Sequence, residues 1–298
     1  MLIIPPVAVT STNLISSNIA EDEYDVYAGG TTYAVGDNVI YDHATYEGLT
    51  ASNVGNQPDT SPTNWLRLGA TNRFKAFDLL LSDQASRAES ITYEIDHGGL
   101  AVSSVAIFNL DAVSVRIQVE DDNEGAVYDE TISLIDTTDV IDWETYFFAP
   151  VGFTKPDIFV NDIPLYGTAE TTITITNTGG TAKVGQVVLG RSEKLGVSVF
   201  GTTLTIEDYS RKDRDAFGNA IIVERAFAKV VDYDVGLITE DVDRVQNVLA
   251  GYRTTPLVWL ATDDAKFGAS VYGYYRRFDI TLSGPAISTA SIEVEGLT

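Results

Sequence analysis

The chain has 298 residues, a formal net charge of −24 and no cysteine, which excludes disulfides, thiolate zinc sites and cysteine nucleophiles. So acidic a surface repels phosphate backbones, and sequence-specific nucleic-acid binding is therefore not expected. No apolar run approaches the roughly 20 residues of a membrane helix, so membrane insertion is not expected either.

The charge fits two roles. It keeps the chain soluble before assembly, or it lines a passage along which DNA slides without sticking, and we favour the first. The length favours two or three domains rather than one.

Residues 1–21 are predicted to form an extended N-terminal arm. β-branched, Ser, Thr and Asn residues surround the pair Pro5 and Pro6, which suits an extended chain better than a helix. The sequence leaves open whether this arm lies on its own chain or on a neighbour. Residues 22–69 are rich in Gly, Tyr and turn residues and are predicted to form a small three-stranded β module.

Residues 70–190 are predicted to form a β-sandwich of jelly-roll-like type. Short alternating runs with turn residues between them, and no helical periodicity, indicate antiparallel strands. The expected strands are residues 104–110, 114–119, 127–134, 143–148, 171–176 and 184–189. Residues 177–180 (NTGG) are expected to end the strand before them.

Residues 191–298 are predicted to form an α+β domain with one helix on a sheet. Residues 221–231 are expected to be one long strand. Thr239 is a candidate cap for the helix that follows, in which Val242, Val245 and Leu249 share one stripe before Gly251. Further strands are expected at residues 256–261, 270–280 and 290–294, so the fold class is mainly β.

The most specific local signal is an aromatic pattern in the small module. Its members are Tyr27, Tyr33, Gly36, Asp37, Val39, Tyr41, Tyr46, Pro58, Trp65, Leu68 and Gly69. Their order resembles the chitin-binding modules of carbohydrate-binding family 5/12, over residues 27–69. The resemblance implies a small β fold and candidate glycan-binding residues on whose rings sugars stack, namely Tyr33, Tyr41, Tyr46 and Trp65.

The sequence departs from that family just after Tyr46. The family places adjacent aromatic residues there, whereas residues 49–53 read LTASN, so part of the sugar platform is missing. We favour the interpretation that the four aromatic residues form the core of a module too small to fold without them. A role in docking on another protein is compatible with that interpretation.

No pattern in the sequence indicates an enzyme, a cofactor or a metal site. Residues 121–125 (DDNEG) lack the later glutamate of a calcium loop and are interpreted as a hairpin turn. Asp263 and Asp264 lie in no catalytic motif, and the isolated His43 and His97 are expected to be structural.

Residues 206–229 are predicted to form a long exposed hairpin with mixed charges. Such a hairpin pairs with a neighbouring subunit, although a solvated face explains the pattern as well. The candidate assembly residues are Tyr209, Arg211, Lys212, Arg214 and Arg225.

Most of the chain resembles tailed-bacteriophage proteins described as carbohydrate-binding or minor tail proteins. The segments that carry this resemblance are residues 179–185, 188–191, 208–212, 217–219, 225–227, 256–259 and 292–297. It implies a structural, non-enzymatic component of the distal tail, baseplate or tail collar, made in the host cytoplasm and present in several copies in the virion. Its partners would be other tail proteins and copies of itself, with host surface polysaccharide as a further candidate partner of the small module.

Two alternatives remain open. A host-adhesion protein would bind surface polysaccharide through the four aromatic residues as its main role. A glycan hydrolase would need a carboxylate pair about 5 to 9.5 Å apart across a cleft, and nothing local in the sequence indicates one.

Overall fold

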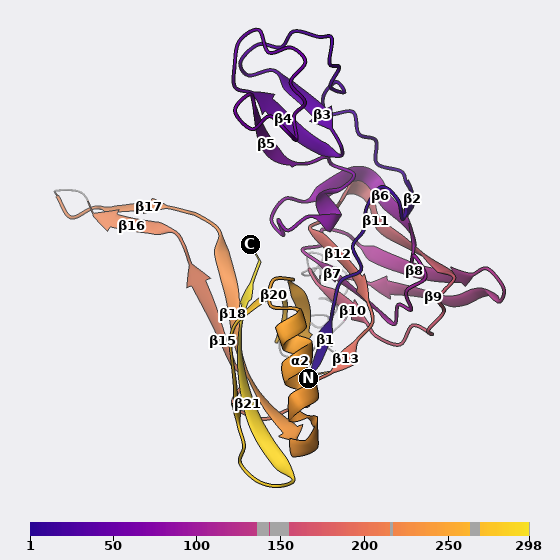
Figure 1. The fold of residues 1–298 in the computed structure, drawn as a ribbon, viewed down its shortest axis with the longest axis vertical. Helices are drawn as coiled ribbons and strands as arrows, with labels where there is room; N and C mark the ends of the chain where they lie inside the picture. Colours follow the sequence, from indigo (N-terminus) through magenta and orange to yellow (C-terminus); the bar gives the residue numbers. More distant parts are fainter. Residues whose placement is uncertain (136–142, 144–154, 215–216, 263–268, 298) are drawn as a thin grey trace.

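The computed structural model describes residues 1–135, 143, 155–214, 217–262 and 269–297 (Figure 1). The chain is mainly β, with helix α2 (Val242–Gly251) near its C-terminal end, so the predicted fold class is confirmed. The strand expected at residues 143–148 lies outside the described residues, apart from Trp143, and Asp263 and Asp264 lie outside them as well.

The small module is a three-stranded antiparallel sheet in the order β3-β4-β5, at one end of the long axis of the molecule (Figure 1). Its strands are β3 (Asn38–Tyr41), β4 (Ala44–Gly48) and β5 (Trp65–Ala70). Asp42 and His43 connect β3 to β4 with φ angles of 46° and 60°. Two successive positive φ angles match the twist of the strands that a two-residue hairpin turn joins.

Two antiparallel sheets facing each other form the sandwich, in the orders β2-β6-β11-β8-β9 and β10-β7-β12. Alternation along β11 buries Ile173 and Ile175, which share one core with Val105 and Ile107 of β7. A short 3₁₀ helix, η1 (Lys75–Phe77), precedes the sandwich. The strands are β2 (Leu14–Ser17), β6 (Ala85–Asp96), β7 (Ser104–Phe108), β8 (Ser114–Asp121), β9 (Gly125–Ser133), β10 (Ile158–Val160), β11 (Ala169–Val184) and β12 (Gln186–Gly190).

The turn expected at residues 177–180 is wrong, because β11 runs through this segment. The pairing of β11 with β6 shifts register between Asn177 and Thr181 and then continues to Val184. Gly179 has a φ angle of 77°, and its N–H donates to the carboxylate of Glu89 on β6, 3.1 Å away. The glycines therefore form a β-bulge within a long strand instead of ending it.

The C-terminal domain has one large sheet in the order β13-β1-β19-β20-β21-β18-β14, with β15 also paired to β18. Helix α2 packs on it through Val245 and Leu249, which share a core with Trp259 and Val271. The strands are β1 (Leu2–Ile4), β13 (Glu193–Lys194), β14 (Val197–Ser198), β15 (Thr203–Asp208), β18 (Phe227–Ile238), β19 (Leu257–Leu260), β20 (Ser270–Thr281) and β21 (Ile287–Gly296).

Thr239 does not cap the helix. Residues Thr239–Asp241 form a 3₁₀ turn, η2, and α2 begins after it. The Thr239 hydroxyl donates to the carbonyl of Gly284 at 2.9 Å and lies 2.9 Å from the Ser288 hydroxyl, because β21 and the loop before it offer these partners. No helix in the described part of the chain is both long and apolar enough to cross a membrane.

The N-terminal segment lies on its own chain and belongs to two sheets. Strand β1 pairs with β13 and β19 in the C-terminal sheet, and β2 pairs with β6 at the edge of the sandwich. Ile3 and Ile4 are fully buried, and the N-terminal amino group donates to the carbonyl of Gly196 at 2.8 Å. Burial of this apolar start links the sandwich to the C-terminal domain.

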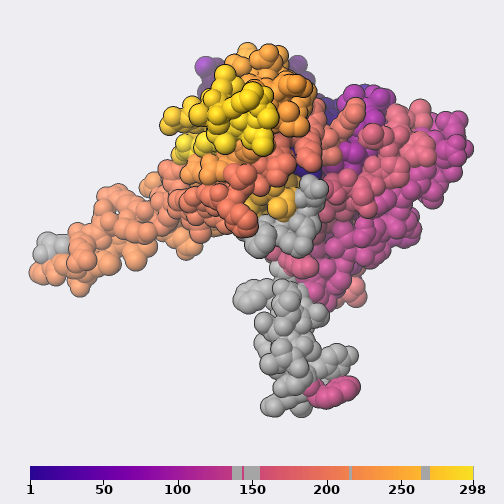
Figure 2. All heavy atoms as spheres, turned by 90° about the horizontal axis from the view of Figure 1, so that it is seen from below, coloured from indigo at the N-terminus to yellow at the C-terminus, as the bar shows by residue number. Residues whose placement is uncertain are grey.

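Residues 221–231 form parts of two strands rather than the single strand expected. Strand β17 (Ala220–Val223) pairs with β16 (Arg211–Arg214), and β18 begins at Phe227. In the break, the N–H of Arg225 donates to the Ser210 hydroxyl at 3.1 Å, so a side chain replaces a regular strand-to-strand bond. Strands β16 and β17 form a ribbon that projects from the body (Figures 1 and 2).

Candidate functional site

Three of the four predicted glycan-binding residues lie in the core of the small module. The exposed fractions are 9% for Tyr33, 7% for Tyr46 and 2% for Trp65. These rings pack with Val39 and Ala44 in one apolar cluster. A sugar stacks on the open face of a ring, and the burial of these three rings leaves little open face for such contact.

The ring of Tyr27 contacts three other aromatic rings of the module. Its ring stacks on Tyr33 with centroids 5.7 Å apart and meets Tyr41 and Trp65 edge-on at 5.8 and 5.9 Å. The Trp65 indole N–H donates to the carbonyl of Asn56 at 2.9 Å. Tyr27 and Tyr41 are only partly buried, so these two rings are the part of the cluster open to a ligand.

Polar groups join the module to the sandwich. His43 Nδ1 lies 2.9 Å from a carboxylate oxygen of Glu21, and the Thr71 hydroxyl donates to the same oxygen at 2.5 Å. The His43 ring also lies over Phe74, with centroids 4.2 Å apart. His43 is therefore part of the junction, which agrees with a structural role.

The ribbon presents a second candidate surface, because every residue of β16 and β17 is exposed. Arg211 pairs with Val223, Lys212 with Ile222 and Asp213 with Ile221 in the antiparallel register. Residues paired in this way lie on the same face of the ribbon. Each face of the ribbon therefore carries charged side chains from β16 beside apolar side chains from β17. The two strands differ in character, because β16 is charged and β17 is apolar.

The predicted assembly residues Tyr209, Arg211, Lys212, Arg214 and Arg225 all lie on the ribbon or at its base. Lys212 forms an ion pair with Asp208 at 2.6 Å, and this hydrogen bond lowers the pKa of Asp208 below its usual range. Arg211 pairs with Asp213, and the Tyr209 hydroxyl donates to Glu295 at 2.9 Å. Several of these groups therefore bind partners within their own chain.

The structure exposes a set of residues that sequence reasoning missed as a surface. Ile221, Ile222 and Val223 on β17 are 50%, 67% and 47% exposed. The signal in the sequence is three consecutive β-branched residues shortly after Gly218 and Asn219 in a charge-rich segment. The sequence places these residues in one long strand of an exposed hairpin, and the candidate assembly residues in that hairpin are its polar and charged residues rather than these three.

A cleft of about 500 Å³ lies between the sandwich and the C-terminal sheet, at the base of the ribbon. Phe108, Phe227 and Leu297 make much of its wall apolar. The Lys229 ammonium donates to the carbonyl of Ser270 at 3.0 Å, and burial lowers the pKa of Lys229. The cleft suits an apolar side chain or strand better than a charged substrate.

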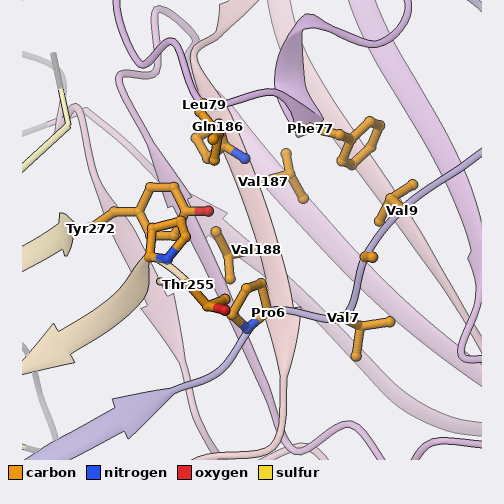
Figure 3. A pocket seen from close by; sticks show the side chains of 12 residues that line it. Pro6, Val7, Val9, Phe77, Leu79, Gln186, Val187, Val188, Thr255 and Tyr272 are labelled. Carbon is orange, nitrogen blue, oxygen red and sulfur yellow. The ribbon is translucent and has the colours of Figure 1, made fainter. Parts of the chain in front are cut away.

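A second pocket of about 190 Å³ lies beside the N-terminal segment (Figure 3). Pro6, Val7 and Val9 of that segment line it together with Val187 and Tyr272. Its volume is below the roughly 300 Å³ of small ligand sites, so it suits one side chain rather than a substrate.

The predicted hairpin turn at residues 121–125 joins β8 to β9, and the Asp121 carboxylate accepts the N–H groups of Asn123 and Glu124. Among the described residues, no group of three His, Asp or Glu side chains is arranged to hold a metal ion. His97 is buried, and its Nε2 lies 2.6 Å from the Thr171 hydroxyl.

No protein-family model matches the chain, and no curated protein matches it significantly.

Proposed function

We propose that this chain is a structural component of a bacteriophage tail, present in several copies and joined to its neighbours through the C-terminal domain. The proposal combines the sequence resemblance with the geometry of the ribbon. The small module is then directed outward as an accessory domain.

The single observation that carries the proposal is the projecting ribbon. An isolated two-stranded hairpin is at best marginally stable in water, and this one exposes three β-branched residues. A protein surface that exposes such residues on an unpaired strand edge is a template for association. The ribbon is thus better suited to a partner than to solvent.

Ion pairs at the base of the ribbon also support the proposal. Arg276 on β20 forms ion pairs with Glu207 on β15 at 2.9 Å and with Glu295 on β21 at 2.7 Å. These contacts tie three strands together where the ribbon leaves the sheet. A firmly held base allows a projecting element to keep its direction.

Cryo-electron microscopy of the phage particle that carries this chain tests the proposal. We expect symmetric copies on the tail, in contact with each other or with other tail proteins through residues 203–229. Absence of the chain from the particle, or ribbons that face only solvent in it, would contradict the proposal.

Host adhesion is the second candidate, and the partly exposed pair Tyr27 and Tyr41 supports it. Binding of chitin oligosaccharides to the purified chain tests it by calorimetry. Tyr41→Ala should abolish binding while the module stays folded, whereas Trp65→Ala would unfold the module and could not distinguish the roles. No measurable binding by the wild-type chain would remove this candidate for that glycan.

A further inference from the structure

The two edges of the ribbon differ in chemistry. Strand β16 has the sequence RKDR, and charged residues on an edge discourage pairing with another chain. Strand β17 has the sequence AIIV, which combines β-branched residues with the absence of charge. The ribbon contains these two strands alone, so no described strand pairs with the outer edge of β17. That edge is open to strand addition.

The neighbouring strand within the chain stops before it reaches this edge. Strand β21 pairs with β18 as far as Val230, opposite Glu295, and β21 ends at Gly296. Strand β17 (Ala220–Val223) precedes β18 in the chain and lies on the ribbon, beyond the end of β21 (Figure 1). A strand from another molecule can therefore occupy the position beside β17 without displacing β21.

The distribution of charge allows a second copy of the chain to be the partner. Residues 206–229 contain five acidic and five basic residues, so the rest of the chain carries the whole net charge of −24. Two acidic bodies of this kind repel each other. The ribbon projects away from the body (Figures 1 and 2), so contact through the outer edge of β17 lets two copies meet while their acidic bodies stay apart.

We propose that the outer edges of β17 from two copies of this chain pair antiparallel about a two-fold axis. Ile222 lies opposite Ile222 of the second copy, and Ile221 lies opposite Val223. The result is a four-stranded sheet with apolar strands at its centre and charged strands at its edges. Such a contact is self-complementary, as a two-fold interface requires. This pairing specifies the partner that the proposed function leaves general, and it relies on that function for the expectation that several copies meet.

The test uses charge at the position on the two-fold axis. Ile222→Lys and Ile222→Glu each place two like charges directly opposite one another, which destabilises a strand pair. Sedimentation velocity of the full chain should show a concentration-dependent dimer for wild type. Each variant alone should associate at least about tenfold more weakly, whereas an equimolar mixture of the two variants should recover the dimer.

The matched control is Ile287→Lys, at a residue 65% exposed on β21 and outside the ribbon, which should dimerise like wild type. Circular dichroism checks that all variants remain folded. A monomeric wild type, unchanged dimerisation of either single variant, or a mixture that stays monomeric would overturn the pairing. The first result together with several copies on the particle would leave the proposed function intact.

Discussion

At the scale of single residues, the aromatic side chains of the small module have a structural role that their type alone does not specify. Trp65 is almost fully buried and satisfies its indole N–H within the module, whereas its neighbour Leu66 points outward. The core of this module consists of few side chains, so each of them contributes a large share of its stability.

Trp65→Ala should unfold the module and leave the rest of the chain folded. Loss of a buried Trp side chain costs about 3–5 kcal/mol, which is comparable with the whole stability of so small a unit. Hydrogen exchange should become faster in β3, β4 and β5 and stay unchanged in the sandwich. Leu66→Ala on the same strand is the control and should change stability by no more than about 0.5 kcal/mol. Unchanged protection in Trp65→Ala would contradict this role.

His97 should make stability depend on pH. Burial lowers the pKa of His97 in the folded state, although Asp96 opposes the shift, so the unfolded chain binds the proton more readily. The contribution of this residue is complete above about pH 6.5 and is lost as the pH falls below that value, by at most about 1.4 kcal/mol per pH unit. His97→Gln should remove this part of the slope in urea unfolding measured from pH 5 to about 7.

The comparison must be made with wild type at each pH. Burial raises the pKa of Asp78 to about 6, so its titration changes stability with the opposite sign in the same range. Because Asp78 is present in both proteins, its effect cancels in the difference. Parallel curves for wild type and His97→Gln would show that His97 does not contribute.

At the scale of elements, the ribbon depends on its connection to the C-terminal sheet. Strand β18 pairs with β15 on one side and with β21 on the other, and Arg276 links β15 to β21 across this arrangement. Beyond this base, β16 and β17 pair only with each other in the described part of the chain. The direction of the ribbon is therefore determined at its base.

Arg276→Ala should loosen the base of the ribbon with little change in overall stability. The ion pairs of Arg276 are partly exposed to water, and exposed pairs are worth roughly 0.2–1 kcal/mol each. Amide hydrogen exchange in β15 should become faster, while exchange in β19 stays the same. Arg277→Ala removes a neighbouring arginine whose ion pair is with Asp279 on the same strand, and this change should leave β15 unchanged. Equal effects of the two variants would contradict the role of Arg276.

At the scale of the whole molecule, charge and shape act together. The acidic body keeps copies apart, and the ribbon carries an uncharged edge away from that body. The N-terminal segment contributes one strand to the C-terminal sheet and one to the sandwich, so it connects the two domains.

Self-association should therefore strengthen with salt. Repulsion between the bodies is screened over about 30 Å at 0.01 M salt but only about 10 Å at 0.1 M. Sedimentation equilibrium should give a lower dissociation constant at the higher salt concentration. Weaker association at higher salt would indicate that attraction between opposite charges drives the contact, contrary to the proposed apolar pairing.

The sequence alone predicted much of the fold and less of the surfaces. Alternation in residues 171–176 and the stripe formed by Val245 and Leu249 each reflect local geometry, so both could be predicted from neighbouring residues. The bulge at Gly179 could not, because the same glycines suit a turn or a bulge, and only the partner strand β6 decides between them.

Composition and periodicity by themselves determined the fold class, the absence of cysteine chemistry and the acidic charge. Tertiary structure decided which residues face solvent: it buried Trp65 and Ile3 and exposed Ile222, although all three are apolar. The physical reason is that burial depends on what lies on the other side of a strand. The sheet that receives β1 comes from distant parts of the chain, and no strand in the described part of the chain pairs with the outer edge of β17.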